Sequence, residues 1–378
     1  MVLTLAVTTE QTAGETRVAA TPDTVKKWTA AGLTVQIQSG AGLGASITDD
    51  AYTAAGATIV KTAKEALKAA DIVLKVRGPA RDEIAALKKG AMVIATLDPY
   101  REKDTLNALA TAGASAYAME FVPRITRAQV MDVLSSQANL AGYRAVIEAA
   151  SAYGKAFPMM MTAAGTVAPA KAFMMGVGVA GLQAIATARR LGAVVSATDV
   201  RPATKEQVES LGAKFLAVED EEFKNAQTAG GYAKEMSAEY KAKQAALTAS
   251  HIAKQDIVIT TALIPGRAAP ILVTKEMVAS MKPGSVLIDL AAPQGGNVEG
   301  CVADTVVDVN GVKIIGLSNI VASIAADASA LYAKNLQAFV GLLIDKDGNL
   351  APDAEDEILK AALVTSGGAI VHPNLKDA

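Results

Sequence analysis

The chain has few of the residues from which metal sites and nucleophilic catalytic sites are built. Its 378 residues include one cysteine, Cys301, and two histidines, His251 and His372. A single cysteine excludes an internal disulfide and is typical of a reducing compartment. Three such residues are too few for a typical zinc site and leave little room for Ser-His or Cys-His catalysis. We therefore predict no bound metal.

An excess of positive charge is also missing. Lysine and arginine total 36 against 38 acidic residues, so we expect no nucleic-acid partner. The most apolar stretch, residues 158–188, is interrupted by Lys171 and by glycines, which argues against a membrane span of about 20 residues. The first residues, Met1–Val7, lack the charged start of a signal peptide and predict a β-strand. We expect a cytoplasmic chain without direct membrane insertion.

Short apolar runs alternate with helical patterns along most of the chain. The hydrophobic share of 51% supplies enough material for buried cores. Strands that alternate with helices predict βαβ units and a mostly parallel sheet. A chain of this length usually forms two domains. The predicted fold class is therefore α/β, with two doubly wound, Rossmann-like domains and a ligand cleft between them.

Two long helical patterns indicate where the chain passes between these domains. Val133–Tyr153 follows a complete set of strands and helices and connects to the second set. Ala322–Ile344 is long enough to return the chain to the first. We predict an N-terminal α/β domain of residues 1–134 plus 325–378, and a nucleotide-binding domain of residues 135–324.

The segment MMMTAAGTVAP separates the two sets, and its central Ala-Gly predicts a β-hairpin. This hairpin has no sheet of its own to join, so we interpret it as an arm that pairs with another subunit. The methionines at its start, Met159–Met161, are more typical of apolar packing than of a cofactor site.

The strongest local motif is GVGVAG at residues 176–181. It follows the apolar strand AFMM and precedes an amphipathic helix, and the next strand ends at Asp199, 18 residues after the last glycine. This pattern is typical of a dinucleotide-binding turn. Gly176 allows the tight turn, Gly178 lets backbone amides approach a pyrophosphate, and Gly181 lets the helix pack on the strand.

Asp199 is the residue expected to choose between the two nicotinamide dinucleotides. Its carboxylate would accept both hydroxyls of the adenosine ribose and repel a 2′-phosphate, which favours NAD(H). Arg201 weakens that argument because an arginine can pair with a 2′-phosphate. Another glycine cluster, residues 40–44, lacks the spacing and the acid, and predicts an ordinary βα loop.

A polar cluster lies between a strand and the first long helix. Residues 123–135 hold two arginines, a glutamine, an aspartate and a serine. Arg124 is able to hold a pyrophosphate or a carboxamide oxygen, and Asp132 a ribose hydroxyl or a carboxamide nitrogen. In the alternative interpretation this is a solvated loop in which Asp132 and Ser135 cap the helix. The residues alone leave both interpretations open.

Several runs together resemble a known family. RITRAQVMDVLSSQANLAGYRAV, MMGVGVAGLQAIATARRLGA, TDVRPATKEQVESLGAKF and TAGGYAKEM are similar to the NAD(H)-binding component (domain I, alpha-1 subunit) of proton-translocating nicotinamide nucleotide transhydrogenase. The resemblance covers nearly the whole chain, and the fold is also similar to that of alanine dehydrogenase. It implies one subunit of a Re/Si-specific NAD(P)⁺ transhydrogenase, which binds NAD(H) and passes hydride from NADH to NADP⁺ on a partner.

The resemblance also implies roles for individual residues. Arg124 and Asp132 would hold the carboxamide region, while Gln129 would reach toward the partner's nucleotide. Gly231 and Tyr232 match a mobile loop that closes over bound nucleotide. The implied catalytic residues are Arg124, Gln129, Asp132 and Ser135. The implied cofactor-binding residues are these four together with Ile125, Thr126, Gly176, Val177, Gly178, Val179, Gly181, Asp199, Val200, Arg201, Gly231, Tyr232, Gln244 and Leu263.

The resemblance implies three kinds of partner. The chain would form a homodimer, dock a separate NADP(H)-binding component, and depend on a membrane component that carries protons. NADP(H) would be bound by the partner and not by this chain. We accordingly expect peripheral attachment to the inner membrane through these partners.

The main alternative is an alanine-dehydrogenase-like amino-acid dehydrogenase. Arg17 and Lys75 resemble the pair that holds the substrate carboxylate there. However, strand 91–97 lacks the acid/base histidine, and Pro293 stands where that family has an aspartate before Gln-Gly-Gly. Oxidation of an amino acid needs a proton acceptor, whereas direct hydride transfer between nicotinamides needs none. The departures favour transhydrogenase, and surface or cleft ion pairs are the default interpretation of Arg17 and Lys75. A third possibility is a nucleotide-sensing module without catalysis.

Overall fold

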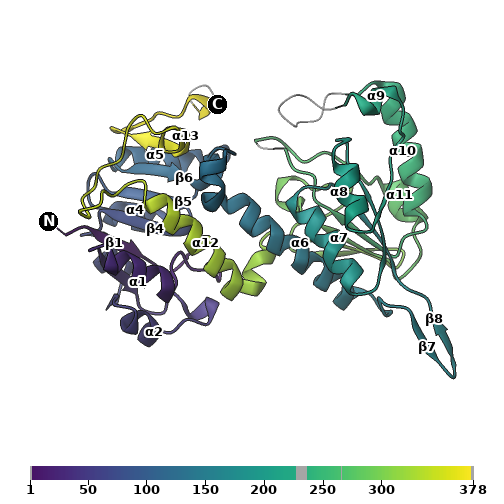
Figure 1. The fold of residues 1–378 in the computed structure, drawn as a ribbon, viewed down its shortest axis with the longest axis horizontal. Helices are drawn as coiled ribbons and strands as arrows, with labels where there is room; N and C mark the ends of the chain where they lie inside the picture. The colour runs from purple at the N-terminus through teal and green to yellow at the C-terminus, as the bar shows by residue number, and fades with distance from the viewer. Residues whose placement is uncertain (1, 227–235, 265, 376–378) are drawn as a thin grey trace. The chain divides into compact units, whose positions relative to one another are not determined.

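The computed structural model describes residues 2–226, 236–264 and 266–375. The chain forms two compact units, shown in Figure 1. Unit 1 comprises Met1–Gln137 and Val321–Ala378, and unit 2 comprises Ala138–Ile320. Each unit is built on one large, mostly parallel β-sheet with helices packed against it. The predicted α/β fold class is therefore confirmed.

The sheet of unit 1 has eight strands in the order β17-β16-β6-β5-β4-β1-β2-β3. The six strands from β6 to β3 are parallel, and β16 and β17 add antiparallel pairs at one edge. Their bounds are β1 (Thr4–Val7), β2 (Thr34–Gln38), β3 (Thr58–Val60), β4 (Ile72–Arg77), β5 (Met92–Thr96), β6 (Ser115–Ala118), β16 (Leu363–Ser366) and β17 (Ala369–Ile370). Strand β6 ends at Ala118, where a short 3₁₀ turn, Met119–Phe121, begins.

Helices cover this sheet on both faces, and a threonine or aspartate side chain caps four of the seven helices named below. Thr21 caps the first helix, and Pro22 occupies its first position. The helices of unit 1 are α1 (Pro22–Ala30), α2 (Asp49–Ala54), α3 (Ala63–Leu67), α4 (Arg81–Ala86), α5 (Lys103–Thr111), α12 (Ala325–Val340) and α13 (Glu357–Ala362). The long helix α6 (Val133–Ala152) begins in unit 1 and continues into unit 2.

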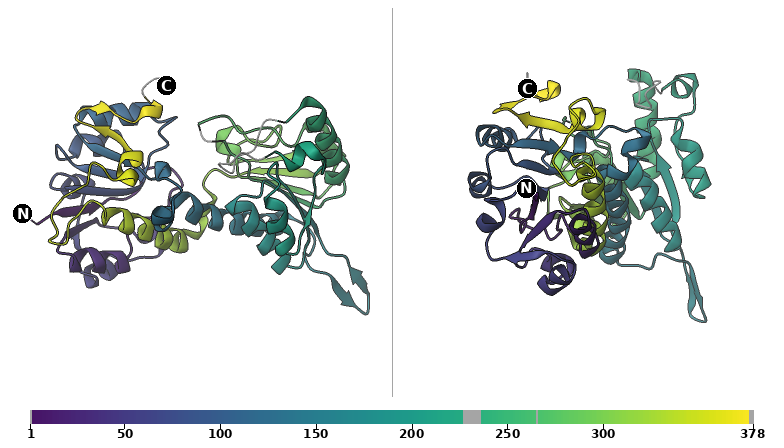
Figure 2. Two further views of the ribbon diagram at one scale, coloured as in Figure 1. Left: turned by 45° about the horizontal axis from the view of Figure 1, so that its top comes forward. Right: turned by 60° about the vertical axis from the view of Figure 1, so that its left-hand side comes forward.

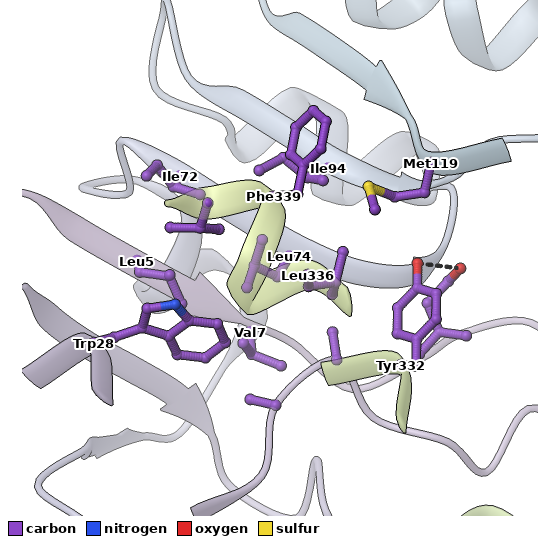
Figure 3. Close-up of a cluster of buried hydrophobic side chains, with 14 of the residues drawn as sticks. Leu5, Val7, Trp28, Ile72, Leu74, Ile94, Met119, Tyr332, Leu336 and Phe339 are labelled. Carbon is purple, nitrogen blue, oxygen red and sulfur yellow. Dashed lines mark hydrogen bonds between the residues drawn. The ribbon is translucent and has the colours of Figure 1, made fainter. Parts of the chain in front are cut away.

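The core of unit 1 joins the two ends of the chain. Leu336 and Phe339 of α12 pack in one buried cluster with residues of β1, β4 and β5 (Figure 3). Tyr332 lies in the same cluster, and its hydroxyl donates to the carbonyl oxygen of Lys75 at 3.0 Å. Burial of these apolar side chains is what holds helix α12 to a sheet whose six parallel strands come from the first 118 residues.

Unit 2 has a seven-stranded sheet in the order β11-β10-β9-β12-β13-β15-β14. All pairs are parallel except β14 with β15. The bounds are β9 (Lys171–Met175), β10 (Val194–Thr198), β11 (Lys214–Phe215), β12 (Ile257–Thr260), β13 (Val286–Asp289), β14 (Val306–Val309) and β15 (Val312–Gly316), with helices α7 (Val179–Arg190), α8 (Thr204–Ser210), α9 (Glu221–Lys224), α10 (Ala238–Ile252) and α11 (Lys275–Ser280). The strand order reverses beside β9, and ligands of such sheets bind at the carboxyl ends of the strands there.

The predicted hairpin is confirmed as a two-stranded arm, β7 (Met160–Thr162) with β8 (Gly165–Val167), which projects from the rest of unit 2 in Figures 1 and 2. Its methionines do not pack against the core of their own unit, so their expected apolar packing stays a prediction. Met159, Met160 and Met161 are 59%, 42% and 78% exposed, because the arm reaches beyond the core of its own unit.

Within the described residues, no helix combines the length and the apolar character needed to cross a membrane.

Candidate functional site

The three glycines of GVGVAG meet three different surroundings. A Cβ at Gly176, whose φ is +101°, would lie 2.6 Å from Oγ1 of Thr261. A Cβ at Gly181 would lie 2.0 Å from the carbonyl oxygen of Gly176. Both positions thus exclude a side chain because the chain itself is in the way. At Gly178, by contrast, an added Cβ would have nothing within 4 Å in the described chain.

Gly178 also immediately precedes helix α7, which places the helix N-terminus at the carboxyl end of β9. A glycine has no side chain to cap the first turn, and that turn contains no acidic residue. The unbonded amides and the helix dipole give this end a partial positive charge. Open space in front of such amides fits a pyrophosphate and explains why the motif has a glycine there.

Asp199 lies just beyond the end of β10, and its carboxylate is fully engaged. Oδ2 accepts the backbone N–H of Val177 at 2.7 Å and Nη2 of Arg201 at 2.9 Å. Oδ1 accepts the backbone N–H and Nε of Arg201, each at 2.9 Å. The hydrogen bonds and charge of Asp199 raise the pKa of the Arg201 guanidinium further above its ordinary value. The predicted ribose-binding acid is thus paired with the arginine that sequence analysis placed beside it.

The other predicted residues of unit 2 that the structure describes lie near the carboxyl ends of its strands. Gln244 on α10 donates to Oγ1 of Thr198 at 3.3 Å and accepts the N–H of Val218 at 2.9 Å, so it links α10 to the end of β10. Leu263 follows β12 and is 47% exposed. Val179 and Val200 are also exposed. The predicted mobile loop, Gly231 with Tyr232, lies outside the described residues.

Three polar residues that no sequence motif marked organise the same strand ends. Thr261 donates its hydroxyl to the carbonyl oxygen of Gly176 at 3.1 Å. The side-chain amide of Asn297 bonds both the N–H and the carbonyl of Ala262, at 3.0 and 2.9 Å. Buried Asp289 in turn accepts the N–H groups of Asn297 and Val298. The available signal was position, since Thr261 directly follows the apolar run IVIT of β12 and Asp289 ends the run VLID of β13.

The polar cluster of unit 1 lies between the end of β6 and the start of α6. Asp132 precedes the helix and accepts the backbone N–H of Ser135 at 2.8 Å and its hydroxyl at 2.5 Å. The capping role that the residues alone left open is therefore present. Arg124, Thr126 and Gln129 are exposed, whereas Ile125 packs against the core of unit 1.

Two contacts anchor the 3₁₀ helix Thr126–Met131 of this cluster. Arg127 forms an ion pair with Asp356 at 2.7 Å, at the start of α13. Asn335 on α12 donates its side-chain amide to the carbonyl oxygen of Val130 at 2.7 Å. The backbone of the cluster is held from two sides, and the side chains of Arg124 and Gln129 are left facing solvent.

Arg17 and Lys75 form ion pairs, as expected, but neither lies at the surface, which was one of the two locations expected for them. Lys75 is 1% exposed, and its ammonium lies 3.0 Å from Glu83. Arg17 is 5% exposed and binds Glu15 through Nε and Nη2, at 2.8 and 2.7 Å. Burial alone would raise the pKa of Glu15, but the hydrogen bonds and charge of Arg17 outweigh it and lower that pKa to about 2. Both cations are thus neutralised by carboxylates of the chain itself.

The two histidines and the cysteine contact residues of the fold that lie outside the glycine turn. His251 lies 2.7 Å from the hydroxyl of Ser196, a partner that sequence spacing did not reveal. His372 is buried and stacks on Phe121. Burial, together with the nearby Asp289 carboxylate, raises the pKa of the Cys301 thiol to about 12, so this thiol is not an activated nucleophile.

Family comparisons match both halves of the chain. The family described as "Alanine dehydrogenase/PNT, N-terminal domain" matches residues 6–141, and "Alanine dehydrogenase/PNT, C-terminal domain" matches residues 145–373. The resemblance inferred from the motifs is therefore confirmed.

The chain differs in its degree of similarity to transhydrogenases and to an alanine dehydrogenase. The chain is 56% identical to the first portion of the NAD(P) transhydrogenase alpha subunit of Rhodospirillum rubrum over 377 residues, which cover 98% of each chain. A crystal structure of transhydrogenase from Sinorhizobium meliloti matches with a TM-score of 0.90 and 56% identity, over 97% of this chain and 100% of the other. An L-alanine dehydrogenase structure matches with a TM-score of 0.85 but 26% identity, over 99% and 98% of the two chains. The similarity is thus strongest on the transhydrogenase side.

Proposed function

Because the chain belongs to the alanine dehydrogenase/PNT family, we propose that it is the NAD(H)-binding subunit of a transhydrogenase. The observation that carries the proposal is the open space at Gly178 in front of the α7 N-terminus, beside an acid at the next strand end. This arrangement fits the pyrophosphate and the adenosine ribose of a dinucleotide. The similarity to transhydrogenase alpha subunits then favours NAD(H) as the ligand.

The residues of unit 2 hold the adenosine half of the nucleotide in this proposal. Gly176, Gly178 and Gly181, with Val177 and Val179, shape the turn and offer backbone amides to the pyrophosphate. Asp199 accepts the ribose hydroxyls. Val200, Gly231, Tyr232, Gln244 and Leu263 complete the pocket, and Arg201 lies beside it, paired with Asp199.

The residues of unit 1 act on the nicotinamide end. Arg124 and Asp132 orient the carboxamide, and Ser135 keeps the Asp132 carboxylate in place through the 2.5 Å hydrogen bond. Gln129, on the exposed side of the anchored 3₁₀ helix, reaches toward the partner's nucleotide. Ile125 and Thr126 contribute backbone to the same loop.

Bound NADH supplies a hydride, which leaves its C4 for C4 of the partner's NADP⁺, so NADH becomes NAD⁺ and NADP⁺ becomes NADPH. No proton is exchanged, and the chain therefore needs orientation and not an acid/base residue. This agrees with strand β5, which carries no histidine, and with Arg17 and Lys75, which are bonded internally. A stand-alone amino-acid dehydrogenase would need both a proton acceptor and free cations.

The proposal includes partners that complete the enzyme. A separate component binds NADP(H), and a membrane component couples hydride transfer of Re/Si stereospecificity to proton translocation. The chain is a homodimer attached peripherally to the cytoplasmic face of the inner membrane. Support for the dimer comes from the exposed methionines of the β7–β8 arm, since exposed apolar side chains on a projecting hairpin favour pairing with a second copy.

The test combines three measurements on the purified chain. We expect it to bind NADH in preference to NADPH, to catalyse nothing alone, and to transfer hydride from NADH to NADP⁺ once the NADP(H)-binding component of a relative is added. An NADH analogue deuterated at C4 would follow the hydride into NADPH. Turnover of alanine, or of pyruvate with ammonia, by the chain alone would contradict the proposal, and binding without transfer in the full mixture would favour the nucleotide-sensing module.

A further inference from the structure

We propose that Arg201 is an internal competitor of the nucleotide, whose guanidinium occupies the acceptor positions of Asp199 until the adenosine ribose displaces it. The inference rests on the proposed NAD(H) site and describes how that site is regulated. An ionised carboxylate has about four acceptor positions on its two oxygens. At Asp199 four donors already fill them, at 2.7 to 2.9 Å. A ribose that binds here must therefore replace existing hydrogen bonds.

Only two of the four donors are free to leave. The N–H groups of Val177 and Arg201 belong to the backbone of the turn and of the strand end. Nε and Nη2 of Arg201 belong to a side chain that rotates away without moving the backbone. The side chain of Asp199 is 7% exposed and that of Arg201 is 33% exposed, so the guanidinium lies on the solvent side of the acid. It is the group that an arriving ligand meets first.

The guanidinium is also a good substitute for the ribose. Its fork presents two N–H donors side by side to the two oxygens of one carboxylate. The 2′- and 3′-hydroxyls of a ribose are likewise two neighbouring donors. NADH is therefore able to replace both bonds of the fork. NADPH is not, because its 2′-oxygen carries a phosphate and donates nothing.

Arg201 has a second anchor, since Nη2 also donates to the carbonyl oxygen of Val177 at 3.2 Å. In the free chain the arginine thus joins the strand end to the glycine turn. While it is paired, the charge of Asp199 is neutralised and repels a 2′-phosphate only weakly. Discrimination between NADH and NADPH then depends on whether the ribose hydroxyls replace the two N–H donors of Arg201. If Asp199 were absent, the freed guanidinium would attract the 2′-phosphate of NADPH.

Three variants of the full chain separate competition from direct binding. Arg201→Gln removes the competitor, so the Kd for NADH falls by about two- to fivefold, the range of an exposed ion pair, and NADPH stays weak because Asp199 keeps its charge. Asp199→Ser releases Arg201 and improves NADPH binding while NADH binding weakens. The double variant Asp199→Ser with Arg201→Gln does not show the improved NADPH binding of Asp199→Ser. Arg190→Gln, on the exposed end of α7, is the control for loss of one positive charge.

The measurements are Kd values for NADH and NADPH by calorimetry, with a thermal melt of each variant to establish folding. Unchanged or weaker NADH binding by Arg201→Gln would overturn the inference, because the arginine would then be inert or a direct ligand. An equal NADPH gain in the single and double variants would also overturn it. Failure of the wild-type chain to bind NADH at millimolar concentration would instead refute the proposed function.

Discussion

The three glycines of the GVGVAG turn differ in what an added side chain would meet. At Gly176 and Gly181 the obstacle is the chain, through Thr261 and through the carbonyl of Gly176. At Gly178 the described chain offers no obstacle. The motif spacing predicted the tight turn at Gly176 and the close approach at Gly181, since both depend on local turn geometry, and the pyrophosphate role of Gly178 stays a prediction. The occupation of Asp199 by Arg201 was not predictable, because it depends on how a flexible side chain folds back at a strand end.

This difference makes Gly178→Ala a test of the site. We expect the variant to fold like the wild type, because its φ of −81° suits alanine and the added Cβ meets open space. NADH binding should weaken by about tenfold or more, because one excess methyl in a close-packed contact costs about 1–3 kcal/mol. Gly154→Ala, where a Cβ also meets nothing, is the matched control for a methyl added in open space. Equal NADH affinity in both variants would exclude Gly178 from the site.

Whole elements were predictable where their pattern is long and regular. The helices of α6, α7 and α10 and the strands of both parallel sheets follow from alternating apolar runs. Strands β14, β16 and β17 and helix α13 were missed, since each spans at most six residues. Short elements carry little periodicity, and β16 forms because β6, more than 200 residues earlier, offers a free edge.

Gly142 lies inside helix α6, where a glycine lowers the intrinsic helix propensity. A Cβ there would lie 2.0 Å from the carbonyl oxygen of Ala180 on α7, so the glycine permits close packing of the two helices. Gly142→Ala gains about 1 kcal/mol of helix propensity. Overpacking against backbone costs about 1–3 kcal/mol and should prevail. We expect a lower melting temperature by calorimetry, relative to wild type and to Gly154→Ala. A raised melting temperature would show that the helices separate at no cost.

At the scale of the whole molecule, the β7–β8 arm exposes methionine side chains that the core of its own unit does not cover. We expect Met161→Asp to dissociate the proposed homodimer, because a carboxylate buried in an apolar interface loses its hydration. Sedimentation velocity at micromolar concentration would report a monomer for this variant and a dimer for the wild type. Val2→Asp, at another exposed apolar residue, is the control and should stay dimeric. A dimeric Met161→Asp, or a monomeric wild type, would contradict the role of the arm.

The sequence by itself determined the α/β class, the glycine turn with its acid, the hairpin and the absence of the histidine that an amino-acid dehydrogenase needs. Each is a local pattern, in which backbone sterics or side-chain periodicity acts over a few residues. Only the tertiary structure decided which buried side chains of β1, β4 and β5 α12 packs against, that Arg17 and Lys75 are buried with glutamates, and that Arg201 fills the acceptor positions of Asp199. These features depend on burial and on hydrogen-bond competition among groups that meet only after the chain has folded, and no local pattern specifies which partner prevails.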